Sequence, residues 1–478
     1  MSTRKSLIFS FIDRYASLVI TVASSMVIAR LLTPAEIGVF SVTMVLLIFV
    51  NTMRDMNAGQ YMVQEKNLTT ERIRAVWALQ LGLGLGLAIL VLLVSNPVAA
   101  FYNEPRMRGI MLVVALNYAI NPFGSLTSAW LIREMRFGSL ALMRFTSVSA
   151  GALLSTGLAW QGHGPISLAY GSLCTTAVNA VVATFYRPKS FPWLPGLAEI
   201  KTVLSFGTKV TGGSFISQLA LNAPELLLGK IQNVAAVGYF SRANGLVQMF
   251  FRLFVDAALN VCMPWFAKCL REDGVLATPY LKATAYLTVL GWPFCFGLAC
   301  LAHPVITLLY GDQWGNSVDL TRILAVATAI SVPASLGRTA LLAAGKVNAV
   351  VKVTVLTAIP MIAAVLVGAF WGLLEVGYLL VLASIVNVVM WLHAVGVNLN
   401  ISWRSTLKVF WCSAQVTALA AIGPALACLV YGLRPEQIVS PILLGGVLAG
   451  IGFIAGTFIF NHPVKTEITS IYFKIRRR

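Results

Sequence analysis

Long apolar stretches recur from one end of this chain to the other. Each spans about 20 residues, enough to cross the hydrocarbon core of a bilayer as a helix that satisfies its own backbone hydrogen bonds. Only 11% of the 478 residues are charged, whereas an ordinary soluble domain carries roughly 25%. The stretches are continuous rather than alternating, which argues against a β-barrel. The sequence therefore predicts an all-α polytopic membrane protein.

Hydropathy predicts about 14 transmembrane helices. The N-terminal stretch is too long for a cleaved signal peptide and contains Asp13 and Arg14, so we expect it to remain as the first span. The predicted spans are residues 7–29, 37–55, 76–95, 109–131, 141–160, 166–186, 205–228, 237–262, 283–302, 319–342, 353–371, 376–397, 409–431 and 440–460.

The positions of lysine and arginine predict the orientation of these spans. Of the 35 such residues, 24 fall in one set of connections and five in the other. Because cytoplasmic connections carry the excess of positive charge, both termini are predicted to be cytoplasmic. The net charge of +18 follows from this bias and from contact with anionic membrane lipids. It requires no nucleic-acid partner.

Several phrases occur twice in the chain, in the same order. "AEIGVFS" at 35–41 is echoed by "AAVGYFS" at 235–241, and "NPVAAFYNEP" at 96–105 by "HPVITLLYGDQW" at 303–314. "NPFGSL" within the fourth span is echoed by "VPASLG" within the tenth. The echoes predict two homologous six-helix bundles, 1–190 and 191–400, followed by an extra helix pair and a basic tail, 401–478. Parallel repeats of this kind are typical of transporters that hold substrate between the halves.

Charged residues within the spans are unevenly distributed. The cations are Arg14, Lys209, Arg242, Arg252, Arg322 and Arg338, and the acids are Asp13, Glu225, Asp256 and Asp319. Arg252 and Asp256 are spaced to pair along one helix face, and Asp319 and Arg322 sit three apart near a helix start, where the acid suits the helix dipole. Lys209, Arg242 and Arg338 have no local acid, and together they favour a water-filled cavity that attracts an anionic substrate such as a phosphate. Each of them alone could instead snorkel to the interface or pair with an acid on another helix.

Three intramembrane acids are candidates for coupling transport to a proton or sodium ion: Asp13, Glu225 and Asp256. Glu225 follows Pro224 inside the seventh span. A proline there could break the helix and free carbonyl groups for a cation, or it could produce a plain kink.

Motifs for catalysis, cofactors and metals are missing from the sequence. No GxxxxGK[ST] phosphate-binding loop occurs, and no connection exceeds about 20 residues, which is too short for a soluble catalytic domain. The histidines, at 163, 303, 393 and 462, are scattered, and the seven cysteines follow no ligand spacing. We therefore expect no enzymatic activity, cofactor or metal, and a disulfide has little support.

The repeated phrases also carry a family resemblance. "ARLLTPAEIGVFS", "NPVAAFYNEP", "LIREMRFGSLALMR", "LLLGKIQNVAAVGYFSRANGL" and "LLYGDQWGNS" resemble the Wzx-type flippases of lipid-linked oligosaccharides, particularly the colanic-acid and exopolysaccharide branch. These flippases belong to the multidrug/oligosaccharidyl-lipid/polysaccharide (MOP) exporter superfamily. The likeness covers roughly residues 5–400.

The resemblance implies two MATE-like six-helix bundles around a central cavity that works by alternating access. The cargo would be an undecaprenyl-diphosphate-linked repeat unit, turned from the cytoplasmic to the periplasmic leaflet of the bacterial inner membrane for exopolysaccharide or lipopolysaccharide synthesis. Cavities in this family are cationic, and the matching candidates are Arg14, Lys209, Arg242, Arg252 and Arg338. A polysaccharide polymerase and a chain-length regulator are the implied protein partners.

Three alternatives fit the sequence less well. A cation-coupled multidrug exporter of the same superfamily would favour acids in its cavity. A membrane-embedded polymerase or ligase typically carries a large periplasmic loop, and the longest outward connection here is about 303–318. A structural scaffold would not explain the repeat.

Overall fold

The computed structural model describes residues 3–55, 58–65, 67–189, 191–272 and 274–476. Within these ranges the structure describes the backbone but not the side chains of a further set of residues: 3–15, 52–55, 58, 60, 64, 201–202, 205–217, 260 and 471–476.

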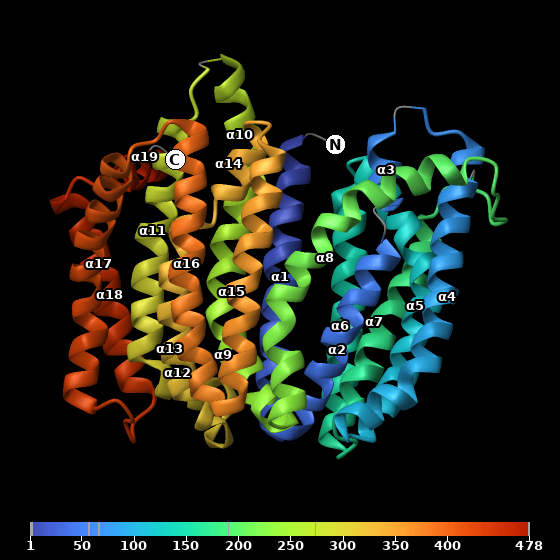
Figure 1. Cartoon of the computed structure of the whole chain (residues 1–478), viewed down its shortest axis with the longest axis horizontal. Helices are drawn as coiled ribbons and strands as arrows, with labels where there is room; N and C mark the ends of the chain where they lie inside the picture. The colour runs from blue at the N-terminus through green and yellow to red at the C-terminus, as the bar shows by residue number, and fades with distance from the viewer. Residues whose placement is uncertain (1–2, 56–57, 66, 190, 273, 477–478) are drawn as a thin grey trace. The chain divides into compact units, whose positions relative to one another are not determined.

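Every regular element in the described ranges is a helix (Figure 1). In chain order they are α1 (Thr3–Leu31), α2 (Pro34–Asp55), α3 (Ala58–Gln64), α4 (Thr70–Tyr102), α5 (Arg106–Arg133), α6 (Phe137–Trp160), α7 (Ile166–Tyr186), α8 (Ile200–Ile231), α9 (Val234–Phe250), the π-helical turn η1 (Phe251–Val255), α10 (Asp256–Glu272), α11 (Ala277–Cys300), α12 (Ala302–Tyr310), the 3₁₀ turn η2 (Asp312–Trp314), α13 (Asn316–Ser331), the 3₁₀ turn η3 (Val332–Ala334), α14 (Gly337–Ala343), α15 (Val347–Trp371), α16 (Leu373–Leu399), α17 (Trp403–Tyr431), α18 (Val439–Ile459) and α19 (Val464–Arg476).

The predicted spans coincide with these helices. Among the described residues, 12 helical segments are long and apolar enough to cross a membrane. The other two predicted spans, 7–29 and 205–228, fall on α1 and α8, which contain side chains outside the description. The prediction of an all-α polytopic membrane protein is therefore confirmed, and the count of about 14 is approximate.

The chain forms two compact units, residues 1–238 and 239–478. In the first unit, α5 packs against α4 and α7, α6 packs against α7 and α1, and α2 packs against α8 (Figure 1). In the second unit, α11 packs against α13 and α17, while α15 packs against α16 and α17 against α18. The predicted division into homologous segments at residue 190 concerns internal homology and stays a prediction.

The first repeated phrase marks the start of a helix in both copies. Thr33 and Glu36 form a capping box: the Thr33 N–H donates to Glu36 Oε2 at 2.8 Å, and the Glu36 N–H donates to Thr33 Oγ1 at 3.3 Å. In the second copy, Asn233 Oδ1 accepts from the Ala236 N–H at 2.8 Å. Each cap satisfies backbone donors that a helix leaves unpaired at its start. The repeated phrase therefore follows a turn between two helices in both copies, between α1 and α2 and between α8 and α9.

The two copies also pack against each other, inside the first unit. A Cβ on Gly38 would overlap the Val234 carbonyl group and lie 3.0 Å from the Gly238 nitrogen. A Cβ on Gly238 would overlap the Pro34 carbonyl group. The starts of α2 and α9 thus cross reciprocally, with backbone against backbone, which small residues permit. This contact explains why glycine occupies the same place in both phrases.

Candidate functional site

Three of the predicted site residues, Asp13, Arg14 and Lys209, have side chains outside the described residues. Glu225 belongs to the first unit, and Arg242, Arg252, Asp256 and Arg338 belong to the second. Most of the predicted site residues with described side chains therefore lie in the second unit.

The first feature of this site is an interruption of the eighth predicted span. The α-helical hydrogen-bond pattern of α9 gives way to a π-helical turn, Phe251–Val255, before α10 begins at Asp256. Arg252 lies in this turn and Asp256 follows it, and both side chains are exposed within the unit. Such π turns occur frequently at functional sites. Two of the predicted site residues thus lie at a local irregularity of a transmembrane helix.

The tenth predicted span is interrupted as well. The helix α13 ends at Ser331, the 3₁₀ turn η3 follows, and α14 begins at Gly337. Pro333 has no N–H to donate to the Ala329 carbonyl, and the Trp292 Nε1–H donates to that oxygen instead, at 2.9 Å. Discontinuous helices whose freed backbone groups are satisfied by neighbours are typical of substrate sites in transporters.

Arg338 lies directly after this second interruption. It is the second residue of α14, and its side chain is exposed within the unit. Among the described residues it forms no ion pair. A guanidinium without a carboxylate partner can accept a phosphate through paired hydrogen bonds.

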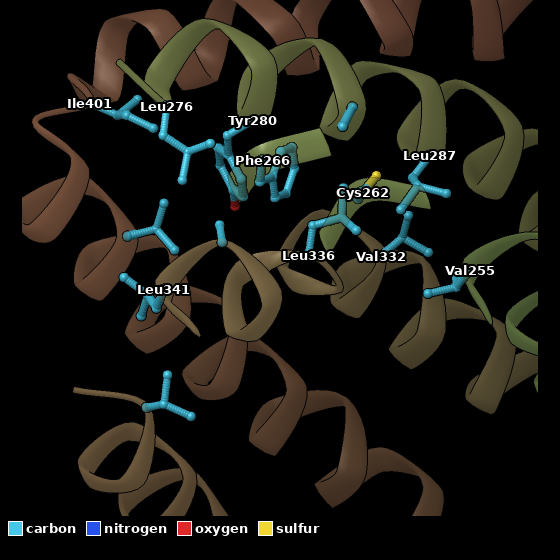
Figure 2. Close-up of a cluster of buried hydrophobic side chains, with 14 of the residues drawn as sticks. Val255, Cys262, Phe266, Leu276, Tyr280, Leu287, Val332, Leu336, Leu341 and Ile401 are labelled. Carbon is cyan, nitrogen blue, oxygen red and sulfur yellow. The ribbon is translucent and has the colours of Figure 1, made fainter. Parts of the chain in front are cut away.

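Both interruptions rest on α11 at Gly291. A Cβ on Gly291 would lie 2.8 Å from Phe250 Cζ and 3.0 Å from both methyl groups of Val332. Phe250 precedes the π turn and Val332 begins the 3₁₀ turn. Figure 2 shows Val255 and Val332 in the buried cluster that joins these segments. The structure therefore brings the elements of Arg252 and Arg338 together on one supporting helix.

Arg242 has different surroundings. Its guanidinium carbon lies 5.4 Å from the ring centroid of Tyr310 and 5.7 Å from that of Trp314, and both of these rings are buried. The Ser317 hydroxyl donates to the Tyr239 carbonyl at 3.0 Å in the same region. Two of the phrases that carry the family resemblance, "VGYFSR" and "LLYGDQW", are thus held together by cation–π contacts. The role of Arg242 in a substrate cavity stays a prediction.

Asp319 lies in the first turn of α13, as predicted, and it forms an ion pair with Arg322, whose Nη1 is 2.7 Å from Asp319 Oδ1. Arg434, 115 residues further on, lies 2.8 Å from Asp319 Oδ2, and no local spacing could have indicated this contact. Burial, together with the charges of Arg434 and Arg322, lowers the pKa of His303. This histidine is therefore neutral near pH 7 and adds no charge to the cluster.

The helix α8 continues from Ile200 to Ile231 with Pro224 inside it. A break at this proline, one of the two alternatives for this position, is therefore wrong. Glu225 is half-buried in the first unit, and its coupling role stays a prediction, as do those of Asp13 and Asp256. In the part of the chain that the structure describes, no three His, Cys, Asp or Glu side chains gather closely enough to hold a metal ion.

The second unit also contains an apolar cavity of about 580 Å³ between α11, α13, α16 and α17. None of the described residues that line it is charged, and its walls include Trp292, Cys295, Phe296, Ala325 and Phe410. The Trp292 Nε1–H already donates to Ala329. Such a cavity suits a hydrocarbon chain rather than a saccharide, because a buried polar group without a partner is costly.

Two curated relatives cover most of this chain. The Teichuronic acid biosynthesis protein TuaB of Bacillus subtilis (strain 168) is 23% identical over 411 residues, which are 84% of this chain and 84% of TuaB. The Lipopolysaccharide biosynthesis protein WzxC of Escherichia coli (strain K12) is 22% identical over 392 residues, which are 80% of this chain and 79% of WzxC.

Solved structures share the fold. The lipid II flippase MurJ in an inward closed conformation has a TM-score of 0.78 at 13% identity, covering 98% of this chain and 100% of MurJ. An inward-facing MATE family transporter of the MOP superfamily has a TM-score of 0.57 at 15% identity, covering 94% of this chain and 96% of the transporter. The predicted MOP-type fold is confirmed.

The family described as polysaccharide biosynthesis protein matches residues 27–319, which is more than half of the chain. This range includes both copies of the repeated helix start and the interrupted eighth span, and it ends near the start of α13, before the interruption of the tenth span. The chain therefore belongs to the polysaccharide biosynthesis protein family, as the resemblance to Wzx-type flippases indicated.

Proposed function

We propose that this protein is a flippase that turns undecaprenyl-diphosphate-linked oligosaccharide repeat units from the cytoplasmic to the periplasmic leaflet of the bacterial inner membrane. It works by alternating access and catalyses no bond formation. The repeat units serve exopolysaccharide or lipopolysaccharide synthesis, and a polysaccharide polymerase and a chain-length regulator act on them afterwards.

The observation that carries this proposal is membership of the polysaccharide biosynthesis family, with relatives aligned over about four-fifths of the chain. Two features of the second unit support it. The exposed guanidinium groups of Arg252 and Arg338 suit the diphosphate, and the apolar cavity suits the hydrocarbon part of the carrier. Arg14, Lys209 and Arg242 are the further candidates for the anionic head group, and Asp13, Glu225 and Asp256 for ion coupling.

Flipping can be tested directly with the purified protein. In proteoliposomes that contain an undecaprenyl-diphosphate-linked oligosaccharide with a fluorescent sugar, a membrane-impermeant quencher should reach nearly all of the fluorescence. It should reach only the outer-leaflet fraction in protein-free vesicles. A proton or sodium gradient is applied in parallel, because either ion could drive the step. Equal quenching with active and heat-denatured protein under every gradient would contradict the proposal.

A second experiment, in cells, distinguishes a flippase from a polymerase by the leaflet in which the repeat unit accumulates. Deleting the gene should leave the lipid-linked repeat unit in the cytoplasmic leaflet, where an added periplasmic glycosidase cannot reach it. Loss of a polymerase would instead leave single units in the periplasmic leaflet, open to the glycosidase. If the repeat unit accumulates in the periplasmic leaflet of the deletion strain, the protein is a polymerase rather than a flippase.

The proposed orientation gives a separate prediction. A reporter fused after Arg478 should be active on the cytoplasmic side, and one inserted at Asp312, between α12 and α13, on the periplasmic side. The physical reason is the excess of Lys and Arg in one set of connections. Paired alkaline phosphatase and fluorescent-protein fusions measure this, and finding both positions on one side would contradict the orientation.

A further inference from the structure

Two of the seven cysteines lie against each other, although 127 residues separate them in the chain. Cys300 is the last residue of α11, and Cys428 lies in the last turn of α17. The Cys428 Sγ donates to the Cys300 carbonyl oxygen at 3.3 Å, and both cysteines are free thiols in the structure. Both side chains are half-buried, so the pair is neither sealed in the core nor fully open.

The packing of α11 on α17 places these residues together. One turn earlier, a Cβ on Gly297 would lie 3.8 Å from Pro424 Cγ. Residues three or four positions apart share a helix face, so the contact at Gly297 and Pro424 continues to Cys300 and Cys428. The chain directly after α17 is held as well, because Arg322 Nη2 donates to the Leu433 carbonyl at 2.6 Å.

We propose that Cys300 and Cys428 form a disulfide that fastens α17 to α11. The proposal rests on the orientation given under the proposed function, in which the connections after Cys300 and after Cys428 face the periplasm. Disulfides form and persist in that compartment. The disulfide would therefore lie at the periplasmic ends of α11 and α17.

Joining two thiols as a disulfide requires a two-electron oxidant. We take this oxidant to be the disulfide of a periplasmic protein, which is reduced to a dithiol. The thiolate of one cysteine attacks the oxidant disulfide and forms a mixed disulfide, releasing one thiolate of the oxidant. The second cysteine then attacks the mixed disulfide, so the Cys300–Cys428 bond forms and the second oxidant thiolate leaves. Two electrons pass to the oxidant, and the two cysteine protons end on its two thiols.

The crosslink would act on the apolar cavity. Cys295 and Ala299 of α11, and Ala418 and Ala421 of α17, line this cavity just inward of the cysteine pair. A bond between Cys300 and Cys428 would fix the spacing of these two walls at the outward end.

Thiol counting in cells tests the proposal. Cells are quenched in acid, free thiols are blocked with N-ethylmaleimide in SDS, and the protein is then reduced and labelled with a polyethylene-glycol maleimide. We expect two added labels in the wild type and none in Cys300→Ser or Cys428→Ser. Cys295→Ser, on the same helix but buried, should keep two labels. Wild-type protein without labels would overturn the proposal, even if diamide crosslinks the purified protein, because the pair would then not be oxidised in the cell.

A second measurement tests the fastening. Reducing the purified wild type should lower its midpoint of thermal unfolding by roughly 5 °C, because the bond closes a long loop. The reductant should leave the midpoint of Cys300→Ser unchanged. Equal midpoints before and after reduction of the wild type would show that the bond does not fasten α17. Neither the thiol count nor the midpoint of thermal unfolding depends on flipping. A negative flippase assay would therefore not contradict the disulfide, and a missing disulfide would not contradict the flippase.

Discussion

Replacing Arg338 by alanine is expected to lower polymer export roughly ten- to hundredfold while the protein still accumulates in the membrane. A diphosphate that enters a cavity of low dielectric must exchange its water for hydrogen bonds to charged groups, each contributing about 1.5–3 kcal/mol. Arg338 is exposed within its unit, directly after the interrupted helix, so its removal should weaken binding without opening a buried cavity. Export is measured as surface polysaccharide, and abundance by immunoblotting.

Three further variants make this result specific. Arg338→Lys should recover part of the export, because it retains the charge but loses the planar fork. Arg404→Ala, at the exposed start of α17, removes the same charge elsewhere and should be nearly silent. Arg242→Ala should instead lower protein abundance, because its guanidinium packs on Tyr310 and Trp314. Export by Arg338→Ala at the level of Arg404→Ala would show that Arg338 does not bind the substrate.

Replacing Gly238 by valine is expected to prevent accumulation of folded protein. A side chain at this position would overlap the carbonyl group of Pro34, and this neighbour is backbone rather than a flexible side chain, so it cannot move aside cheaply. Overpacking in a well-packed core costs about 1–3 kcal/mol even when neighbours adjust. Gly38→Val should behave in the same way, because its side chain would overlap the Val234 carbonyl group. Fluorescence-detected size-exclusion chromatography in detergent measures the folded fraction.

The matched control for this prediction lies on the same helix. Among the described residues, a Cβ on Gly245 of α9 would meet nothing within 4 Å. Gly245→Ala should therefore be neutral or slightly stabilising, since alanine favours a helix over glycine by about 1 kcal/mol. A Gly238→Val protein that elutes like Gly245→Ala would show that α2 and α9 do not cross as closely as described.

The sequence alone determined the properties that depend on short segments. Apolar length determined the spans, since each helix must bury its own backbone groups within the bilayer. The capping box of Thr33 and Glu36 also depends only on a short segment, because it acts over three residues. The position of Asp319 near a helix start was predicted from the sequence, and its contact with Arg322 is local as well, because their spacing places them on one helix face. The repeated phrases led to the family.

Tertiary structure decided what depends on the packing of distant segments. Hydropathy located the spans near residues 250 and 333 but could not show that both are interrupted and rest on Gly291. The contact of Arg434 with Asp319 and that of Cys428 with Cys300 each join residues more than 100 positions apart. Periodicity and spacing describe one helix at a time, whereas these contacts arise from the register in which two helices pack. That register is set by the small residues and side-chain shapes of both partners together, so no single stretch of the sequence contains it.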